Sequence, residues 1–266
     1  MPLSLHLHLH LLCLSFLFFT ATSIAEYACI HSSQMCEDVN ISYPFWQIGA
    51  SDSSALKNIC GISVFGLYCP HNGSKPTIEL SGETFIVEEI NYADYTLTLV
   101  DADVTTQDTS CPRARNITLD DTFPLIYSSL DVNLSFYFNC TIDPPPPISL
   151  YLAPIECLRS GENMSYVCVL PQCGVEVNDW SRSCEESLPV PVMKGKISYP
   201  VNDTFDEAMQ IGFVLNWTNM TDCFKCEASG GMCGFNDSTS AREFRCFCNN
   251  GKIANPECSS ACPRNW

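Results

Sequence analysis

Basic residues are scarce in this sequence of 266 residues. Thirteen Lys and Arg stand against thirty Asp and Glu, which gives a formal net charge of −17 at pH 7. A chain this acidic is repelled by phosphate backbones and by anionic lipid head groups. We therefore expect neither nucleic acid nor an anionic membrane surface as a partner.

Histidine is also rare. Three of the five lie among the first ten residues, so only His31 and His71 remain in the rest of the chain. Nucleophilic catalysis by Ser or Cys needs a base beside the nucleophile, and two isolated histidines give little support for one. A carboxylate pair for glycoside hydrolysis is the alternative, because acidic residues are numerous and their pairing in space is invisible in a sequence. We expect no enzymatic activity, no cofactor and no resident metal.

A hydrophobic run of the ~20 residues that a membrane-spanning helix needs is missing as well. The apolar stretch at the N-terminus, Leu11–Phe19, is shorter and leads into small residues that end at Ala25. This pattern is typical of a secretory signal peptide, which we place at residues 1–25, with cleavage after Ser23 as the alternative. We therefore expect a secreted, extracellular protein without a membrane span.

Cysteine, in contrast, is abundant. Seventeen of the eighteen cysteines follow the predicted signal peptide, and in an oxidising compartment they form disulfides. The number is odd, so one thiol is left free or bonds to another chain, and Cys258 and Cys262 are the candidates. The predicted disulfide cysteines, whose pairing stays open, are Cys29, Cys36, Cys60, Cys69, Cys111, Cys140, Cys157, Cys168, Cys173, Cys184, Cys223, Cys226, Cys233, Cys246, Cys248, Cys258 and Cys262.

Five of these cysteines have a spacing that would suit a zinc ion in a cytosolic protein. They are Cys223, Cys226, Cys233, Cys246 and Cys248. Downstream of a signal peptide, disulfides are the better interpretation. A redox-active Cys-x-x-Cys is not favoured either, because no βαβ pattern surrounds it.

Signals for N-linked glycosylation are frequent, and in a secreted protein they mark surface loops and strand edges. The ten acceptors are Asn40, Asn72, Asn116, Asn133, Asn139, Asn163, Asn202, Asn216, Asn219 and Asn236. We expect at least half of them to carry a glycan. Asn139 precedes a cysteine at a predicted strand end and is a candidate for burial, and Asn216 and Asn219 are close together.

Four consecutive prolines at residues 144–147 interrupt the chain. Such a run forms an extended polyproline segment that acts as a semi-rigid spacer. It predicts an N-lobe of residues 26–143 and a C-lobe of residues 148–266. Each lobe is long enough to fold by itself with the help of disulfides.

The local patterns are mainly those of strands. Residues 84–90, 95–100 and 134–138 are short, partly alternating runs of β-branched and aromatic residues, with turn residues at 71–74, 81–82 and 91–94. In the C-lobe, Thr204–Glu207 has a capping-box pattern that predicts one short helix. We expect a mainly β protein of two disulfide-rich lobes joined by the proline linker.

Short motifs in the first half of the chain resemble a plant module. They are Cys36, Ile41–Trp46, Cys60–Gly61, Phe65–Cys69, Thr96–Asp101 and Phe136–Cys140. In this order they are similar to the wall-associated-kinase galacturonan-binding domain. Glu37 stands where that family commonly has Gly after the cysteine, which leaves the geometry of this turn open.

The second half resembles another module. Its motifs are Val190–Val192, Gly212–Trp217, Cys223–Cys226, Ser229–Gly234 and Phe244–Cys248, and they look like the wall-associated-kinase C-terminal domain. The pair has the layout of the ectodomain of leaf-rust-resistance-locus-like receptor kinases, in which a membrane helix and a Ser/Thr kinase follow. This sequence contains no Gly-rich nucleotide loop, so the resemblance implies an ectodomain without kinase activity. A truncated form of a full receptor kinase is an open alternative.

The aromatic string at residues 41–46 is the first candidate for ligand contact. Tyr43, Phe45 and Trp46 could stack on sugar rings and offer hydrogen bonds to hydroxyl groups. The other interpretation is that they pack in the interior beside a disulfide. A string this apolar favours the interior.

The resemblance implies binding of galacturonan, a polyanion, yet residues 26–140 contain four basic and fifteen acidic residues. Binding therefore needs a local contact, such as Arg113 and Arg115 on uronate carboxylates, or Ca²⁺ bridging between acids of the protein and of the polymer. Asp101 and Asp103, with Asp120 and Asp121, are candidates for the bridging oxygens. A solvated loop is the simpler interpretation of these acids.

These observations together predict a secreted recognition protein of the plant cell wall or apoplast. Disulfide-rigidified lobes would present loops to pectin, and rigidity lowers the entropy lost on binding. The alternative is a protein-interaction or decoy form that pairs with membrane receptors or binds their peptide ligands.

Overall fold

The computed structural model describes residues 33–49, 58–70, 73–105, 115, 117–119, 124–170, 173, 179–197, 205–217, 220–236 and 243–258. The predicted signal peptide lies outside these residues. The chain forms two compact units. The terminal unit combines the segment up to Cys69 with the segment from Asn219 onward, and the central unit comprises Pro70–Thr218.

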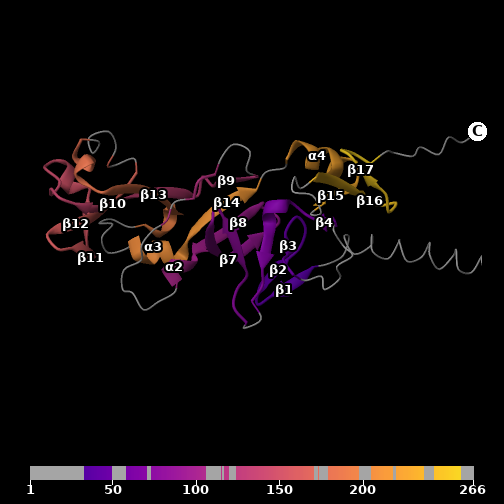
Figure 1. Cartoon of the computed structure of the whole chain (residues 1–266), viewed down its shortest axis with the longest axis horizontal. Coiled ribbons are helices and arrows are strands. Elements are labelled where there is room, and N and C mark those ends of the chain that lie inside the picture. Colours follow the sequence, from indigo (N-terminus) through magenta and orange to yellow (C-terminus); the bar gives the residue numbers. More distant parts are fainter. Residues whose placement is uncertain are drawn as a thin grey trace, which may run out of the picture. The chain divides into compact units, whose positions relative to one another are not determined.

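The terminal unit consists of short strands from both ends of the chain. They are β1 (Gln34–Cys36), β2 (Val39–Ile41), β3 (Trp46–Gln47), β4 (Asn58–Cys60), β5 (Gly66–Tyr68), β15 (Gly231–Asn236), β16 (Glu243–Cys248) and β17 (Ile253–Ala254). Strand β4 pairs antiparallel with β15, and β16 joins β15 to β17 (Figure 1). The N-terminal and C-terminal segments therefore share one sheet.

The hairpin of β1 and β2 turns at Glu37. The φ angle of Glu37 is 55°, in the left-handed region that glycine adopts most easily. Glu37 thus takes the conformation that a glycine would take. The turn forms despite the larger side chain.

The first sheet of the central unit contains the strands that the sequence predicts at residues 84–90 and 95–100. The strands that the central unit contributes to it are, in order, β6 (Thr77–Leu80), β7 (Glu83–Asn91), β8 (Thr96–Asp101), β14 (Phe213–Trp217) and β9 (Leu125–Tyr127). Strand β14 comes from far along the chain and pairs antiparallel with both β8 and β9. The two prediction windows are confirmed, and the insertion of β14 is a long-range feature.

The second sheet of the central unit has the order β11 (Ala153–Ser160), β12 (Asn163–Val169), β10 (Asp131–Cys140), β13 (Glu186–Met193). Strand β10 contains the predicted strand at residues 134–138. Its alternate side chains pack on opposite faces: Phe136 and Phe138 lie in one apolar cluster, and Tyr137 packs with Trp180 in the other. Both faces of the middle of β10 are therefore buried, and residues 134–138 are buried without interruption.

The helices and 3₁₀ turns in the part of the chain that the structure describes are all short. They are α2 (Ala102–Thr105), α3 (Phe205–Ile211), α4 (Thr221–Ala228), η1 (Ser63–Phe65), η2 (Ile148–Leu150), η4 (Trp180–Ser183) and η5 (Lys194–Lys196). Helix α3 confirms the predicted helix, with Phe205, Ala208 and Met209 buried. Helix α4 was not predicted, because its buried side is made of Cys223 and Cys226 instead of aliphatic residues. Among the described residues, no helix has the length and apolarity needed to cross a membrane.

The proline run at residues 144–147 lies inside the central unit. Strand β10 precedes it, and the partners of β10 in the sheet, β12 and β13, follow it. Strand β14, which also follows the run, pairs with β8 and β9, which precede it. The lobes of residues 26–143 and 148–266 stay a prediction about module order along the sequence.

All fourteen cysteines that the structure describes are disulfide-bonded. The pairs are Cys36–Cys69, Cys140–Cys184, Cys168–Cys173, Cys223–Cys233, Cys226–Cys246 and Cys248–Cys258, and Cys60 and Cys157 are disulfide-bonded as well. Cys258, named above as a candidate for a free thiol, is thus paired. The other candidate, Cys262, lies outside the described residues.

Candidate functional site

The aromatic string at residues 43–46 packs inside the terminal unit. Phe45 is 3% exposed and stacks on Phe65, with 4.8 Å between the ring centroids. The indole N–H of Trp46 donates a hydrogen bond of 3.0 Å to the carbonyl of Ile62. The Trp46 ring covers Gly66 so closely that a Cβ there would lie 2.6 Å from a ring carbon. Phe45 and Trp46 therefore serve as packing residues.

Tyr43 joins the two segments of the terminal unit. Its hydroxyl donates to the carboxylate of Glu227 in α4 and accepts a hydrogen bond of 3.0 Å from the backbone N–H of Cys233 in β15. Burial, together with the Glu227 carboxylate, raises the pKa of Tyr43 above its ordinary value. The Tyr43 hydroxyl is therefore committed to partners within the protein.

Arg115 is predicted from the sequence to contact uronate carboxylates. In the structure it pairs with acidic residues of the central unit. Its guanidinium pairs with Glu83 at the start of β7 and with Asp103 in α2. Asp101 accepts a hydrogen bond of 2.9 Å from the backbone N–H of Asp103, and burial raises its pKa. A uronate carboxylate would have to compete with Glu83 and Asp103 for this guanidinium. Arg113 lies outside the described residues.

Asp101 and Asp103, proposed above as Ca²⁺ ligands, do lie together. The Arg115 guanidinium occupies the space beside Asp103, so a positive charge already neutralises part of this acidic group. Asp101 and Arg115 also border a small pocket with Phe85, Met209 and Phe213. The pocket has room for about one or two water molecules, too little for a sugar ring. The other two candidates, Asp120 and Asp121, lie outside the described residues.

A second aromatic group, which the sequence interpretation missed, lies at the turn between β7 and β8. The rings of Tyr92 and Tyr95 contact the ring of Trp217 edge to face, with centroid distances of 6.0 and 5.7 Å. Trp217 is 5% exposed, whereas Tyr95 is 56% exposed. The backbone N–H of Trp217 donates to the carbonyl of Tyr95 at 3.1 Å. The buried indole thus supports an exposed Tyr ring.

The turn beneath Tyr95 is built by Asn91. Its side-chain oxygen accepts hydrogen bonds of 3.0 Å from the backbone N–H groups of Ala93 and Asp94, and its amide donates to the Asp94 carboxylate at 3.0 Å. Tyr95 follows with a φ of 56°. The sequence signal was the turn composition at residues 91–94. What could not be seen was Trp217, which reaches this turn only through the pairing of β14 with β8.

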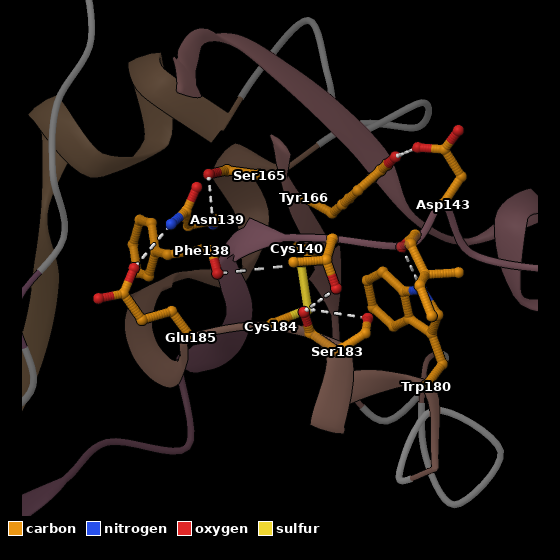
Figure 2. The surroundings of a disulfide bond; sticks show 12 residues. Phe138, Asn139, Cys140, Asp143, Ser165, Tyr166, Trp180, Ser183, Cys184 and Glu185 are labelled. Carbon is orange, nitrogen blue, oxygen red and sulfur yellow. Dashed lines mark hydrogen bonds between the residues drawn. A yellow bond between two sulfur atoms is a disulfide. The ribbon is translucent and has the colours of Figure 1, made fainter. Parts of the chain in front are cut away.

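The acceptor Asn139 is engaged inside the fold, beside the Cys140–Cys184 disulfide (Figure 2). Its side-chain amide donates to Glu185 at 2.8 Å, and its backbone N–H donates to the Ser165 hydroxyl at 3.1 Å. Asn133, on the same strand, is exposed. The two acceptors on β10 therefore present their amides very differently.

Sulfur atoms cluster around Gly231 in the terminal unit. The Cys226–Cys246 and Cys248–Cys258 disulfides bring the sulfurs of Cys246 and Cys258 to 3.5 Å from each other. A Cβ at Gly231 would lie within 2.9 Å of three sulfurs. Because these atoms are bonded in pairs, they are not the thiolates that a zinc ion requires.

Comparison with known proteins identifies two modules in this chain. Residues 29–101 match the family described as wall-associated receptor kinase galacturonan-binding, and residues 156–251 match the family described as wall-associated receptor kinase C-terminal. No solved structure matches the chain.

Curated relatives come from Arabidopsis thaliana. Leaf rust 10 disease-resistance locus receptor-like protein kinase-like 1.2 is 29% identical over 254 residues, which cover 92% of this chain and 37% of that protein. The similarly named kinase-like 2.1 is 28% identical over 225 residues, covering 80% of this chain and 32% of that protein. The chain thus spans about a third of the length of these relatives. It contains a region that matches the wall-associated receptor kinase galacturonan-binding family, followed by a region that matches the wall-associated receptor kinase C-terminal family, and it is similar in sequence to leaf rust 10 receptor-like kinases.

Proposed function

We propose that this chain is an extracellular, non-enzymatic recognition protein that binds pectin in the plant cell wall. The observation that carries the proposal is the match of residues 29–101 to the galacturonan-binding family. The relatives are receptor-like kinases by name, and this chain spans about a third of their length. Disulfides that fix both units support recognition, because a rigid surface loses less entropy on binding.

Tyr95 is the contact residue that the geometry supports best. It lies within residues 29–101, its ring is more than half exposed, and Trp217 holds it from behind. An exposed aromatic face packs against the C–H face of a sugar ring, and the phenol O–H can bind a hydroxyl group. Phe45 is buried, and Tyr43 and Trp46 are only partly exposed because their polar atoms bind partners within the terminal unit.

Titration calorimetry with galacturonan oligomers, with and without Ca²⁺, tests the proposal. We expect binding by the wild type and affinity about threefold to tenfold weaker for Tyr95→Ala, since aromatic contacts of this kind contribute about 0.5–1.5 kcal/mol. Tyr68→Ala is the matched control, because Tyr68 is 54% exposed but belongs to the terminal unit. Absence of binding by the wild type at millimolar oligomer would remove the pectin proposal, and a Ca²⁺ requirement would add bridging to it.

Secretion and glycosylation belong to the same proposal. Glycopeptide mapping of the protein secreted from plant cells should find a glycan at the exposed Asn133 and none at Asn139, whose amide is bound to Glu185. A glycan on Asn139 in folded protein would contradict the structural role given to that amide. Retention of the chain in the cytosol would contradict the extracellular proposal.

Binding of a protein partner is a second candidate function, supported by the strand β9. This strand lies at the edge of its sheet in the central unit. Ile126 in the strand and Leu130 just after it are both more than half exposed. An exposed edge strand can pair with an extended segment of another chain, and a Lys on the edge discourages such pairing. Ile126→Lys should therefore abolish co-purification of a protein partner from plant extracts while leaving oligomer binding intact. Unchanged co-purification would count against this candidate.

A further inference from the structure

Two lysines of the central unit stand apart from the other basic residues. Lys194 and Lys196 flank Gly195 in η5, and all three residues are exposed. Among the described residues, the cations that have a carboxylate partner are Lys75, Arg115, Arg159, Lys225 and Arg245. Lys194 and Lys196 form no ion pair with any described residue. In the part of the chain that the structure describes, no other two cations without such a partner are this close in sequence.

The backbone of η5 is fixed from both sides. The backbone N–H of Lys194 donates to the carbonyl of Leu130 at 2.9 Å, and that of Met193 donates to the carbonyl of Gly212 at 3.1 Å. Ile197, directly after the turn, packs against the apolar cluster of the second sheet. The two ammonium groups therefore extend from a rigid base, which reduces the entropy that a ligand must remove.

The surface of the turn is accessible to an extended ligand. A Cβ added at Gly195 would have no atom within 4 Å, so a polymer can approach the backbone between the two lysines. Leu130, held to Lys194 by the backbone hydrogen bond, is 59% exposed and offers apolar surface beside the charges. A cationic pair next to an apolar residue suits a sugar acid, whose ring has C–H faces and whose carboxylate is charged.

The neighbouring acids that the structure describes leave these charges available. Asp131 faces Met193 across the β10–β13 ladder, but its carboxylate accepts two hydrogen bonds of 3.1 Å from the backbone N–H of Val214. Asp206 and Glu207 begin α3, which packs on η5, and neither forms an ion pair with the lysines. The turn is thus a local positive spot on an acidic protein.

We infer that Lys194 and Lys196 form a binding site for the carboxylates of a galacturonan chain. This inference rests on the proposed pectin-binding function. Each ammonium group donates charge-assisted hydrogen bonds to a uronate carboxylate. The net charge of −17 repels a polyanion, but at physiological ionic strength this repulsion is screened beyond about 8 Å. Attraction must therefore come from cations in direct contact. The site belongs to residues 156–251, the module whose family description names no ligand.

The test compares two double variants that remove the same charge. Lys194→Gln with Lys196→Gln removes the site, and Arg182→Gln with Lys252→Gln removes two exposed cations that also have no carboxylate partner among the described residues. The probe is a de-esterified galacturonan oligomer of defined length. We expect the lysine variant to bind about fivefold more weakly, as for two exposed ion pairs, and the control to stay within about twofold of the wild type.

A methyl-esterified oligomer provides the second arm, because its carboxylates carry no charge. The lysine variant and the wild type should bind that oligomer equally. Equal affinity of wild type and lysine variant for the de-esterified oligomer would overturn the inference while leaving the proposed function intact, and so would equal losses in both double variants. If the wild type binds neither oligomer, the proposed function and this inference both fall. Since all four residues are exposed, unchanged thermal unfolding verifies the fold of each variant.

Discussion

The two compact units of this protein are stabilised by different means. The central unit buries aliphatic and aromatic residues on both faces of β10, with Phe136 stacked on Phe138 and covered by Phe205 of α3. The terminal unit has a cluster made of Cys226, Cys246 and Cys248. Its described interior combines these crosslinks and the hydrogen bonds of Tyr43 with buried side chains such as Phe45 and Phe65.

This difference determines which residues are available for ligands. The terminal unit uses its conspicuous aromatic string to hold its own two chain segments together. The central unit has enough apolar core to leave Tyr95, Lys194 and Lys196 exposed on fixed backbone. An aromatic string that stands out in a sequence is therefore a poor guide to a binding surface.

The largest expected effect comes from the core of the central unit. Phe136→Ala removes a fully buried ring and leaves a cavity, which should lower the free energy of unfolding by about 4 kcal/mol. Chemical denaturation followed by near-UV circular dichroism measures the loss. Leu130→Ala, at an exposed position of the same unit, should change the stability by less than about 0.5 kcal/mol. Similar losses in both variants would contradict the assignment of the core.

Removal of a disulfide should have a somewhat smaller effect, and mainly in the terminal unit. Replacing Cys226 and Cys246 by Ser opens a loop with a sequence separation of 20, and should cost about 3 kcal/mol. The same change at Cys168 and Cys173, which close a loop with a separation of 5 in the central unit, should cost about 2 kcal/mol. Hydrogen exchange resolved by peptide should show the first loss in β15 and β16. If β10 opened instead, the contrast between the units would be wrong.

Much of the fold could be predicted from the sequence where the pattern is local. The strands at residues 84–90 and 134–138 and the helix at Phe205 follow from alternation, β-branched residues and a capping box. Helix α4 could not be found in this way, because cysteines form its buried side and look like disulfide partners alone. The insertion of β14 between β8 and β9 depends on pairing of residues distant in the chain, for which a single sequence has no signal.

Loss of one hydroxyl group in the terminal unit should have a moderate effect. Tyr43→Phe leaves the Glu227 carboxylate and the Cys233 N–H without their partner, which should cost about 1–2 kcal/mol. Tyr68→Phe, at an exposed residue of the same unit, is the matched control and should be neutral. Faster hydrogen exchange at Cys233 in the first variant alone would confirm that Tyr43 joins the two segments. Unchanged hydrogen exchange at Cys233 would mean that Tyr43 contributes by packing alone.

The candidate site was only partly accessible from the sequence. Composition and the module motifs indicated a polyanion ligand and a shortage of cations, and they singled out Arg115. They could not show that Glu83 and Asp103 already hold Arg115, since three separate segments meet there. The position of the exposed Tyr95 ring depends on its contact with Trp217. Lys194 and Lys196 are available for a ligand because no described carboxylate forms an ion pair with them. These properties belong to the folded surface.

The smallest predicted effect is a pH dependence confined to the central unit. Burial raises the pKa of Asp131 from its ordinary value of 3.8 to about 7. The folded state therefore holds the proton more tightly than the unfolded state, so this group's contribution to stability is greatest below about pH 4 and decreases as the pH rises to about 7. After allowance for solvent screening of a half-buried group, the change amounts to about 1 kcal/mol.

Asp131→Asn tests this effect, because the amide oxygen can still accept from the Val214 N–H but cannot ionise. Between pH 5 and pH 8, the free energy of unfolding of the variant should rise by about 1 kcal/mol relative to that of the wild type. Hydrogen exchange should locate the change in β14, where Asp131 accepts from Val214. The terminal unit should not respond, since its buried Tyr43 has a pKa raised above the ordinary tyrosine value and keeps its proton throughout this range. An equally large pH-dependent change of hydrogen exchange in β15 would contradict the prediction that the effect is confined to the central unit.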